Sequence, residues 1–298
     1  MKKKAAIAIQ LILIQLVVFT TLSFGQSKAD LPFYICMSDL DSNTKQALKQ
    51  DGFMFNTLLD WYTPTLDETA FRARVNQAFP DANATGIGVL DWEGEAFNKL
   101  RLVDANNPDY QSALAQYIKA LQIAKSMRPN MKWGYYALPF GIRDANERQW
   151  NKTIAPLLQE CDIFFPSLYQ YYPQSSTTGD NESTYVTKYI TEMLRLGAKY
   201  NKMVMPFVWH RIYINNKDKA LTLIPLKDFE IRIIDIMNVK YKGKGVDGMV
   251  WWSSDTFYYK QGNDNMNKEV PAGTDFATYH AALMVKYGAS IKSVLAQN

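Results

Sequence analysis

Two acidic residues separated by a single tryptophan stand at the end of an apolar stretch. Residues 86–90 are apolar and predict a buried β-strand, and Asp91, Trp92 and Glu93 follow at its polar end. Because side chains alternate along a strand, Asp91 and Glu93 leave the same face, with origins about 6–7 Å apart. Two carboxyl groups at this separation, beside an aromatic ring, suit the cleavage of a glycosidic bond. The alternative is a strand end whose two acids simply face water.

Aromatic residues gather at the carboxyl ends of the other predicted strands. The chain is rich in aromatic residues (13%), with 18 Tyr and 7 Trp. Rings that stack on a sugar, among a few polar groups, are typical of a carbohydrate cleft. The candidate substrate-binding residues are Asp60, Trp61, Trp92, Tyr135, Tyr136, Tyr169, Tyr171, Trp209, His210, Trp251 and Trp252. Core packing is the alternative for each ring taken singly, and a structural hydrogen-bonded role is the alternative for His210.

Strands and helices that could position these residues alternate along the chain. Apolar strands are predicted at residues 31–38, 55–62, 84–93, 132–139, 162–170, 202–212 and 246–254. Helices are predicted at residues 44–50, 67–79, 108–126, 147–160, 183–200, 227–241 and 276–295. Strands that are apolar throughout and separated by helices indicate a parallel sheet with both faces covered.

The number of strands favours a closed barrel over an open sheet. Seven strand–helix units within about 265 residues suit an α/β fold of the distorted (β/α) TIM type, with about seven parallel strands. An open doubly wound sheet is the alternative, but no strand–turn–helix carries the glycine-rich phosphate motif common in such sheets. We expect residues 30–298 to form a single barrel domain.

The N-terminus has the pattern of a secretory signal. Three lysines at positions 2–4 precede an apolar stretch at residues 5–24, and small residues follow near position 25. An uncleaved anchor helix is the alternative, since the stretch is nearly long enough, but Gln10 and Gln15 interrupt it. We expect residues 1–25 to be a cleaved signal peptide and the protein to be secreted or periplasmic, with no stable membrane anchor.

Charge and composition limit the partners of the chain. Without the three signal lysines the net charge falls from +4 to +1, so no global field attracts nucleic acid, and local basic groups must meet any polyanionic substrate. Cys36 and Cys161 are predicted too far apart in a barrel for a disulfide, which predicts two buried thiols. With two histidines, His210 and His280, no zinc ligand cluster is expected. We expect a monomer without cofactor whose partner is a polysaccharide.

Four short blocks, in the same order, carry a family resemblance. Residues 88–93 hold the acid pair, residues 132–139 a Trp-Gly-Tyr strand, residues 165–169 a Pro-Ser-Leu-Tyr strand, and residues 248–252 a strand ending in two tryptophans. These blocks resemble those of the hyaluronidase family, glycoside hydrolase family 56, and its distant bacterial relatives. The resemblance covers about residues 30–255 and implies a distorted barrel of about seven strands.

The resemblance also implies roles for single residues. Glu93 would be the general acid/base, and Asp91 would orient the 2-acetamido group of the substrate, whose oxygen is the nucleophile. Tyr169 and Trp252 would line the subsite of the reacting sugar. Residues 94–97 lack the Trp-Arg-Pro that usually follows the family's acid pair, and the family's paired disulfides are absent. Another N-acetylhexosamine-containing glycan therefore fits as well as hyaluronan.

The predicted function is an exported, hyaluronidase-like endo-glycosidase that acts with retention. Burial beside Trp92 and the like charge of Asp91 would raise the pKa of Glu93 and keep it protonated. The first alternative is a retaining glycosidase for a non-acetylated glycan, with Asp60 or Asp255 as nucleophile. The second is a non-catalytic carbohydrate-binding barrel. The chitinase signature is excluded because it needs acids at the positions of Val89 and Gly86.

Overall fold

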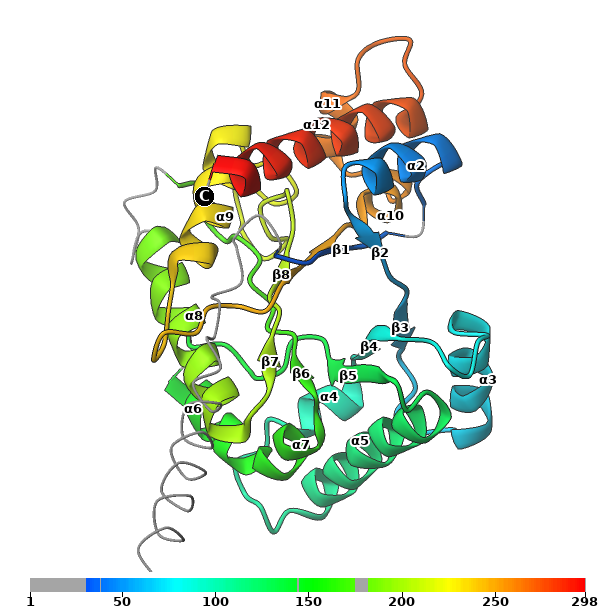
Figure 1. Ribbon diagram of the computed structural model, residues 1–298, viewed down its shortest axis with the longest axis vertical. Coiled ribbons are helices and arrows are strands. Elements are labelled where there is room, and N and C mark those ends of the chain that lie inside the picture. Colours follow the sequence, from blue (N-terminus) through cyan, green and yellow to red (C-terminus); the bar gives the residue numbers. More distant parts are fainter. Residues whose placement is uncertain (1–30, 38, 144, 175–181, 298) are drawn as a thin grey trace, which may run out of the picture.

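Short parallel strands line the centre of the computed structural model, which describes residues 31–37, 39–143, 145–174 and 182–297 (Figure 1). The expected signal peptide, residues 1–25, lies outside the described residues. The described strands are β1 (Phe33–Cys36), β2 (Met54–Phe55), β3 (Leu58–Trp61), β4 (Gly86–Trp92), β5 (Met131–Tyr135), β6 (Ile163–Phe164), β7 (Met203–Val204), β8 (Phe207–Val208) and β9 (Met249–Trp252).

Two extended segments join these strands into a ring. Within residues 54–61, β2 pairs with β1 and β3 pairs with β4. Within residues 203–208, β7 pairs with β6 and β8 pairs with β9. β9 pairs in turn with β1, β4 pairs with β5, and a bridge from Tyr136 to Phe165 links β5 to the β6 segment. All these pairs are parallel. The ring has seven positions, which confirms the predicted distorted barrel.

The division of the segment at 203–208 has a chemical cause. Pro206 has no backbone N–H and cannot continue a strand ladder as a donor. Its carbonyl oxygen instead accepts from the amide of Val250 at 3.0 Å. The segment therefore lacks one ladder hydrogen bond at the proline but lies between both neighbours, since the amide of Phe207 still donates to the carbonyl oxygen of Pro166, in the segment after β6, at 2.9 Å.

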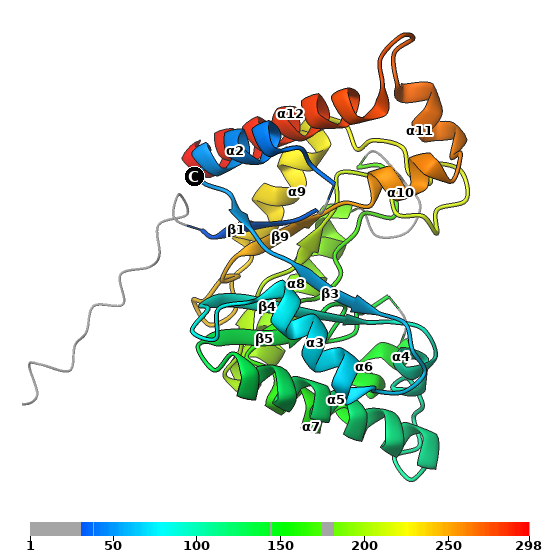
Figure 2. The ribbon, with the colours of Figure 1, turned by 90° about the vertical axis from the view of Figure 1, so that its right-hand side faces the viewer.

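Helices surround the ring. They are α2 (Ser42–Gln50), α3 (Glu68–Ala78), α4 (Glu95–Lys99), α5 (Pro108–Met127), α6 (Ala145–Thr153), α7 (Ala155–Glu160), α8 (Glu182–Tyr200), α9 (Leu226–Asn238), α10 (Asp255–Lys260), α11 (Asp264–Glu269) and α12 (Phe276–Gln297). Both ribbon views place α3 and α5 over β3, β4 and β5, with α12 beside α2 at the opposite end (Figures 1 and 2). In the described part of the chain, no helix combines the length and the apolarity that a membrane crossing needs.

The helices follow local signals in the sequence. The side chain of Asn107 accepts from the amide of Asp109 at 2.9 Å, and Pro108 occupies the first turn, so α5 begins where its cap predicts. The helix predicted at residues 147–160 is divided in two instead. Pro156 starts the second part, α7, because proline is accepted in a first turn but not within a helix.

The packing of β4 decides where its side chains point. Ile87 and Val89 belong to a cluster of apolar side chains that is separate from the main core, whereas Leu90 and Trp92 belong to that main core with the helices. Since side chains alternate, Asp91 continues the face of Ile87 and Val89 toward the inside of the ring. Both cysteines are free and buried, as predicted.

Candidate active site

Asp91 and Glu93 line one cavity of about 1200 Å³. Their backbone is fixed from two sides: the hydroxyl of Tyr117 on α5 donates to the carbonyl oxygen of Trp92, and the amide of Glu93 donates to the carbonyl oxygen of Trp61 at 3.3 Å. Gly94 then turns the chain into α4 with a φ of +86°, a conformation that side chains rarely allow. The two carboxyl groups are therefore held at the end of β4.

The cavity environment favours the protonated form of both acids. Asp91 is only 6% exposed, and its Oδ1 has no hydrogen-bond partner among the described residues. Burial raises the pKa of Asp91 well above its ordinary value, and the charges of Glu93 and Asp60 raise it further. Burial also raises the pKa of Glu93, while the nearby guanidinium of Arg101 lowers it. The pair therefore retains a proton at a pH where exposed carboxyl groups are ionised.

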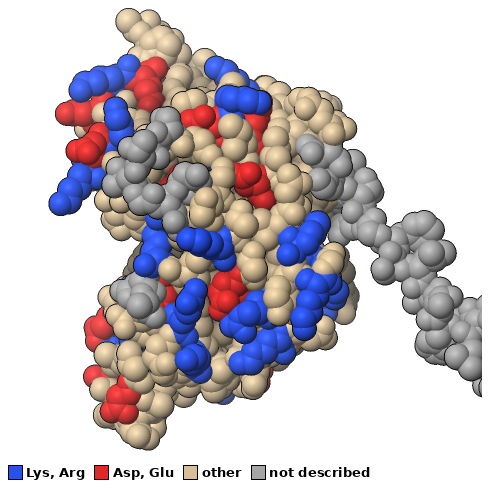
Figure 3. Space-filling view, turned by 90° about the vertical axis from the view of Figure 1, so that its left-hand side faces the viewer, with Lys and Arg blue, Asp and Glu red and all other residues tan. Residues whose placement is uncertain are grey.

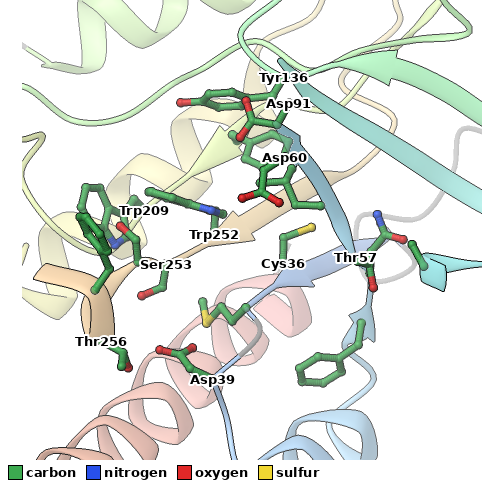
Figure 4. Close-up of a pocket in the computed structure, with 18 of the residues that line it drawn as sticks. Cys36, Asp39, Thr57, Asp60, Asp91, Tyr136, Trp209, Trp252, Ser253 and Thr256 are labelled. Atoms are coloured by element: carbon green, nitrogen blue, oxygen red, sulfur yellow. The ribbon is translucent and has the colours of Figure 1, made fainter. Parts of the chain in front are cut away.

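A third acid stands beside the pair. Asp60 on β3 is in register with Asp91 on β4, and neighbouring strands lie about 4.8 Å apart. Figure 4 shows Asp60 and Asp91 pointing into the same end of the cavity, near Tyr136, whereas Asp39 lies at the other end. Three carboxyl groups thus approach one another here.

Aromatic rings form one wall of the cavity. The ring of Tyr169 stacks on that of Trp252, with centroids 5.5 Å apart and an interplanar angle of 19°. Trp209 packs edge-on against Trp252 at 5.1 Å, and Tyr136 lies 6.0 Å from Tyr169. Tyr169, Trp209 and Trp252 belong to three neighbouring strand positions of the barrel, and Tyr136 follows β5. The four aromatic side chains offer apolar faces for a sugar.

A buried polar network supports this wall from behind. Asp255 accepts hydrogen bonds from Trp209 Nε1 at 3.1 Å, His210 Nε2 at 3.0 Å, Arg211 Nε at 2.6 Å and Ser253 Oγ at 2.7 Å. Burial alone would raise the pKa of Asp255, but His210 and Arg211 hold it well below its ordinary value. Asp255 is an ionised structural anchor that fixes the orientation of Trp209.

His210 belongs to the same network and has no contact with the cavity. Trp251 Nε1 donates to His210 Nδ1 at 3.1 Å, so the proton of the neutral ring lies on Nε2, which donates to Asp255. Burial lowers the pKa of His210, which agrees with a neutral ring. Within the described residues, no group of three His, Cys, Asp or Glu side chains could hold a metal ion.

Comparison with protein families identifies the chain. The family model described as hyaluronidase, glycoside hydrolase family 56, matches residues 96–271, more than half of the chain. The chain belongs to the hyaluronidase family. The matched range begins three residues after Glu93 and does not include the acid pair. The support for the roles of Asp91 and Glu93 is therefore the geometry of the cavity in this hyaluronidase-family protein.

Several curated relatives agree with this assignment. The hyaluronidase of Apis mellifera is 26% identical over 225 residues, which cover 62% of this chain and 56% of that protein. A chondroitin hydrolase of Caenorhabditis elegans is 26% identical over 164 residues, 42% of this chain and 36% of that protein. Hyaluronidase-1 of Mus musculus is 25% identical over 60% of this chain and 46% of its own length. The alignments thus span about half of these relatives or less.

Solved structures share the fold. The crystal structure of bee venom hyaluronidase superposes with a TM-score of 0.62 at 18% identity, covering 88% of this chain and 99% of that one. A second structure of that enzyme, in complex with a hyaluronic acid tetramer, gives a TM-score of 0.61. The hyaluronidase-family barrel described above is therefore a known architecture.

The structure brings most of the predicted site residues together. Those that line the large cavity are Asp60, Asp91, Glu93, Tyr136, Tyr169, Trp209 and Trp252. Tyr171 lines a smaller adjoining cavity. Five predicted substrate-binding residues line neither cavity, and for these the prediction was wrong: Trp61, Trp92, Tyr135, His210 and Trp251.

Strand alternation explains the misplaced rings. The ring of Trp92 faces outward, stacks on Tyr117 at 4.7 Å and donates to the carbonyl oxygen of Thr63 at 2.8 Å. It therefore provides no apolar wall for Glu93. Trp61 packs on Phe71 of α3 at 5.1 Å, and Tyr135 donates to the carbonyl oxygen of Tyr117 at 2.8 Å. Each of these rings is one residue away from a side chain that does enter the cavity.

Trp251 and Asp255 are also outside the cavity. Trp251 packs between Phe53 and Phe229, in the core outside the ring. Asp255 is fully buried and its carboxylate accepts from four protein side chains, so it is not the strand-end nucleophile of the first alternative. Asp60 remains in place for that role.

Several cavity residues were not predicted. Tyr213 follows the last predicted residue of its strand by one position, Tyr62 follows β3 directly, and Tyr258 lies within the short helix α10. Cys36 has the inward parity that period two assigns to every second residue of its strand. Arg101 lies just after α4, a helix too short to show a periodic pattern, so no sequence signal places it near Glu93.

Proposed function

We propose that this protein is a retaining glycoside hydrolase that cleaves a hyaluronan-like polysaccharide containing N-acetylhexosamine. Glu93 acts as general acid and then as general base, and Asp91 assists attack by the 2-acetamido oxygen of the substrate. The observation that carries this proposal is the joint placement of Asp91 and Glu93 in one aromatic-lined cavity. Family membership supports the same reaction class.

The unpartnered oxygen of Asp91 supports its role. A buried carboxylate oxygen without a donor is costly, and a ligand that brings an N–H to it is favoured. The acetamido N–H of the reacting sugar is such a donor. As positive charge grows on that group in the transition state, the hydrogen bond to an ionised Asp91 becomes stronger.

A proton shared by Asp91 and Glu93 fits the order of steps in the proposed reaction. In the free protein the deeper burial of Asp91 favours a proton there, since its pKa is raised by burial and by the charge of Glu93. A substrate N–H bound to Asp91 stabilises its carboxylate, so the remaining proton is better placed on Glu93. Glu93 then donates that proton to the leaving glycosidic oxygen, and later takes one from water.

The names of the relatives support the substrate class. They include hyaluronidases and a chondroitin hydrolase, whereas the compared crystal structure holds a hyaluronic acid tetramer. We propose hyaluronan or chondroitin as the substrate, cut within the chain.

Asp60 supports a second candidate reaction. Asp60 is the register neighbour of Asp91 on the adjacent strand, about 4.8 Å away at the backbone, and the two carboxyl groups of retaining glycosidases are about 5–5.5 Å apart. Such an enzyme would not need a 2-acetamido group. Hyaluronan and chemically N-deacetylated hyaluronan therefore distinguish the two reactions.

Reducing-end release from both polymers, with the anomer of the fresh product read by NMR, tests the proposal. Acetamido participation predicts cleavage of the acetylated polymer alone, with retention. Equal cleavage of both polymers would favour Asp60 as nucleophile, and an inverted product would contradict both. Binding of hyaluronan without any product over days would favour a non-catalytic carbohydrate-binding barrel.

We also propose that residues 30–298 form one exported catalytic domain that acts as a monomer, after removal of a signal peptide at residues 1–25. The basic and apolar pattern of the N-terminus supports this. N-terminal sequencing of the protein from the exported fraction of its host should give a start near residue 26. A start at residue 1 would contradict the proposal.

A further inference from the structure

A basic surface lies at the end of the barrel opposite the acid pair. The helix α8 ends at Tyr200, just before β7, and a turn at residues 241–244 lies shortly before β9, so both are at the amino ends of strands. Asp91 and Glu93 lie at the carboxyl end of β4. Because the strands are parallel, about one strand length separates the two places, on the order of 20 Å for the seven residues of β4.

Basic side chains from α8 and from this turn form the surface. The amide of Asp247 donates to the carbonyl oxygen of Val204 at 2.9 Å, which joins the chain after the turn to β7, the strand that follows α8. Figure 3 faces the side with α8 and α9 and shows basic side chains gathered over its middle. We define the basic surface as the exposed residues Arg195, Lys199, Lys240, Lys242 and Lys244.

Most of this positive charge has no acidic partner. Arg195 is paired with Glu192 on α8, with 2.7 Å between Nη2 and Oε1. Asp247 lies near Lys244, but its Oδ2 accepts from the amide of Val204 at 2.8 Å. No acid among the described residues forms an ion pair with the remaining side chains of the surface, which are Lys199, Lys240, Lys242 and Lys244. A surplus of positive charge therefore faces solvent here.

Aromatic rings and the turn hold the lysines in place. The Nζ atom of Lys199 lies 4.7 Å from the ring centroid of Tyr200, and that of Lys242 lies 5.6 Å from the ring centroid of Tyr241. Two backbone hydrogen bonds between Tyr241 and Lys244, of 2.9 and 3.1 Å, close the turn. A cation that a ring already positions loses less freedom when it binds a ligand.

The backbone of the turn does not require a lysine at its centre. The φ angles of Lys242 and Gly243 are +50° and +81°, the pattern of a type I′ turn, in which asparagine and glycine are favoured. A side chain with a Cβ is less favourable than glycine in this conformation. Lys242 therefore contributes its charge to the surface rather than stability to the turn.

The composition of the surface favours a glycan over a membrane. A protein that lies on an anionic membrane inserts apolar side chains beside its basic ones. The described residues with large exposed apolar side chains are Met54, Tyr62, Val103, Tyr172, Ile214, Phe257 and Val285, and none of these is on α8 or in the turn. Separate cations beside the half-buried rings of Tyr200 and Tyr241 instead suit a linear glycan, whose anionic groups recur along the chain.

We propose that the basic surface is a second glycan-binding site, which holds a segment of the polyanionic polymer distant from the segment in the cavity. The identity of this polymer, hyaluronan or chondroitin, rests on the proposed function. Binding at two places on one protein raises the effective concentration of a long polymer at the cavity. The surface therefore makes the protein selective for long chains and takes no part in the reaction itself.

Turnover of long and short hyaluronan tests this site. The short oligosaccharides are too short to reach from the cavity to the basic surface. For long hyaluronan, loss of the four lysines should raise KM, expressed per disaccharide, by at least about 10-fold at unchanged kcat, since two linked sites usually gain about 10²–10⁴-fold. For the short oligosaccharides kcat/KM should stay at the wild-type value. The test variant combines Lys199→Gln, Lys240→Gln, Lys242→Gln and Lys244→Gln.

A control variant removes the same charge from exposed positions on α5, α9, α11 and α12. It should cleave long hyaluronan like wild type. An equal rise of KM in the control would mean that net charge alone acts, and this would overturn the second site. The control variant combines Lys119→Gln, Lys227→Gln, Lys268→Gln and Lys286→Gln.

Two outcomes for the test variant also overturn the second site. Equal losses for long and short hyaluronan would mean that the four lysines only support the structure. An unchanged KM for long hyaluronan would mean that they do not meet the polymer. In either case cleavage by wild type would leave the proposed function intact.

A binding measurement separates the second site from the proposed function. Calorimetric titration of Glu93→Gln protein with long hyaluronan needs no turnover. Affinity that falls when the four lysines are replaced supports the site, even if the wild-type protein cleaves no glycan. Lysine-dependent binding of phosphatidylserine vesicles, with unchanged affinity for hyaluronan, would assign the surface to lipid and overturn the glycan assignment.

Discussion

The burial of Asp91 costs stability at neutral pH, in keeping with the catalytic role that we propose for this residue. Its carboxyl group is buried, has an oxygen without a described partner, and faces two other acids, and these features together raise its pKa well above the ordinary value. A carboxyl group whose pKa is higher in the folded than in the unfolded state stabilises the fold most at low pH. That contribution is lost as the pH rises past the unfolded pKa of about 3.9.

Asp91→Asn should therefore abolish activity but stabilise the fold at neutral pH, because it removes a charge that the cavity disfavours. The melting temperature at pH 7 should rise by about 2–4 °C for each kcal/mol gained. The gain should vanish near pH 3, where Asp91 is protonated in both states. Asp218→Asn, at an exposed position in a turn far from the acid pair in the sequence, should change stability by less than about 0.5 kcal/mol. An Asp91→Asn variant that melts lower at pH 7 would contradict this view of the site.

The rate should depend on pH through the proton that Asp91 and Glu93 share. Activity falls at low pH when the pair takes up a second proton, and falls at high pH when the shared proton leaves. Because burial raises the pKa of both acids, both limbs should lie above the ordinary carboxyl range.

Removal of Arg101 should shift this dependence of the rate on pH in a defined direction. The guanidinium lowers the pKa of Glu93, so Arg101→Gln should move the alkaline limb of kcat/KM to higher pH. Arg72→Gln, on the exposed surface of α3, should leave the limb in place. A shift to lower pH in Arg101→Gln would show that Glu93 is not the group that titrates there.

Single residues also show what a strand pattern can predict. Period two correctly put Asp91 and Glu93 on one face, because β4 is regular and its apolar side is buried. A position at a strand end was not sufficient for the rings, since Trp61, Trp92 and Trp251 each face outward beside an inward residue. The neighbours of each strand in the barrel decide which of its two faces points inward. A single sequence does not show those neighbours.

At the scale of elements, the strands were predictable as segments but not in their pairing. Apolar runs located all seven ring positions, and caps located the start of α5. The pairing of residues 54–61 and 203–208 with two neighbours each depends on contacts with strands distant in sequence. α4, α10 and α11 have five or six residues, too few for a helical period to appear.

The contact between β5 and the β6 segment depends on Gly134. A Cβ at this position would lie 2.0 Å from the carbonyl oxygen of Ile163, a backbone atom that cannot rotate away. Gly134→Ala should destabilise the fold by at least about 1–3 kcal/mol, the usual cost of overpacking, measured as a loss in the free energy of unfolding. At Gly245 a Cβ would meet only the flexible end of Lys240, so Gly245→Ala should be nearly neutral. Equal stability of the two variants would refute the close approach of these strands.

At the scale of the whole molecule, the ring unites parts that lie far apart in the sequence. β3 and β4 supply the acids, whereas β8, β9 and the segment after β6 supply Trp209, Trp252 and Tyr169. The barrel could be predicted because the alternation of strand and helix repeats along the chain. The small cavity could not, because Arg101 and Arg143 meet Glu93 only through the folded arrangement of α4 and the loop after β5.

In the proposed reaction Glu93 is the proton donor, and Glu93→Gln tests this role most directly. Turnover of hyaluronan should fall by at least about 10²–10⁴-fold, the usual contribution of general acid–base catalysis, while calorimetry shows oligosaccharide affinity close to that of wild type. Glu95→Gln, two residues further along and paired with Lys99 on the surface, should turn over at the wild-type rate. Wild-type turnover by a correctly folded Glu93→Gln protein would contradict the account.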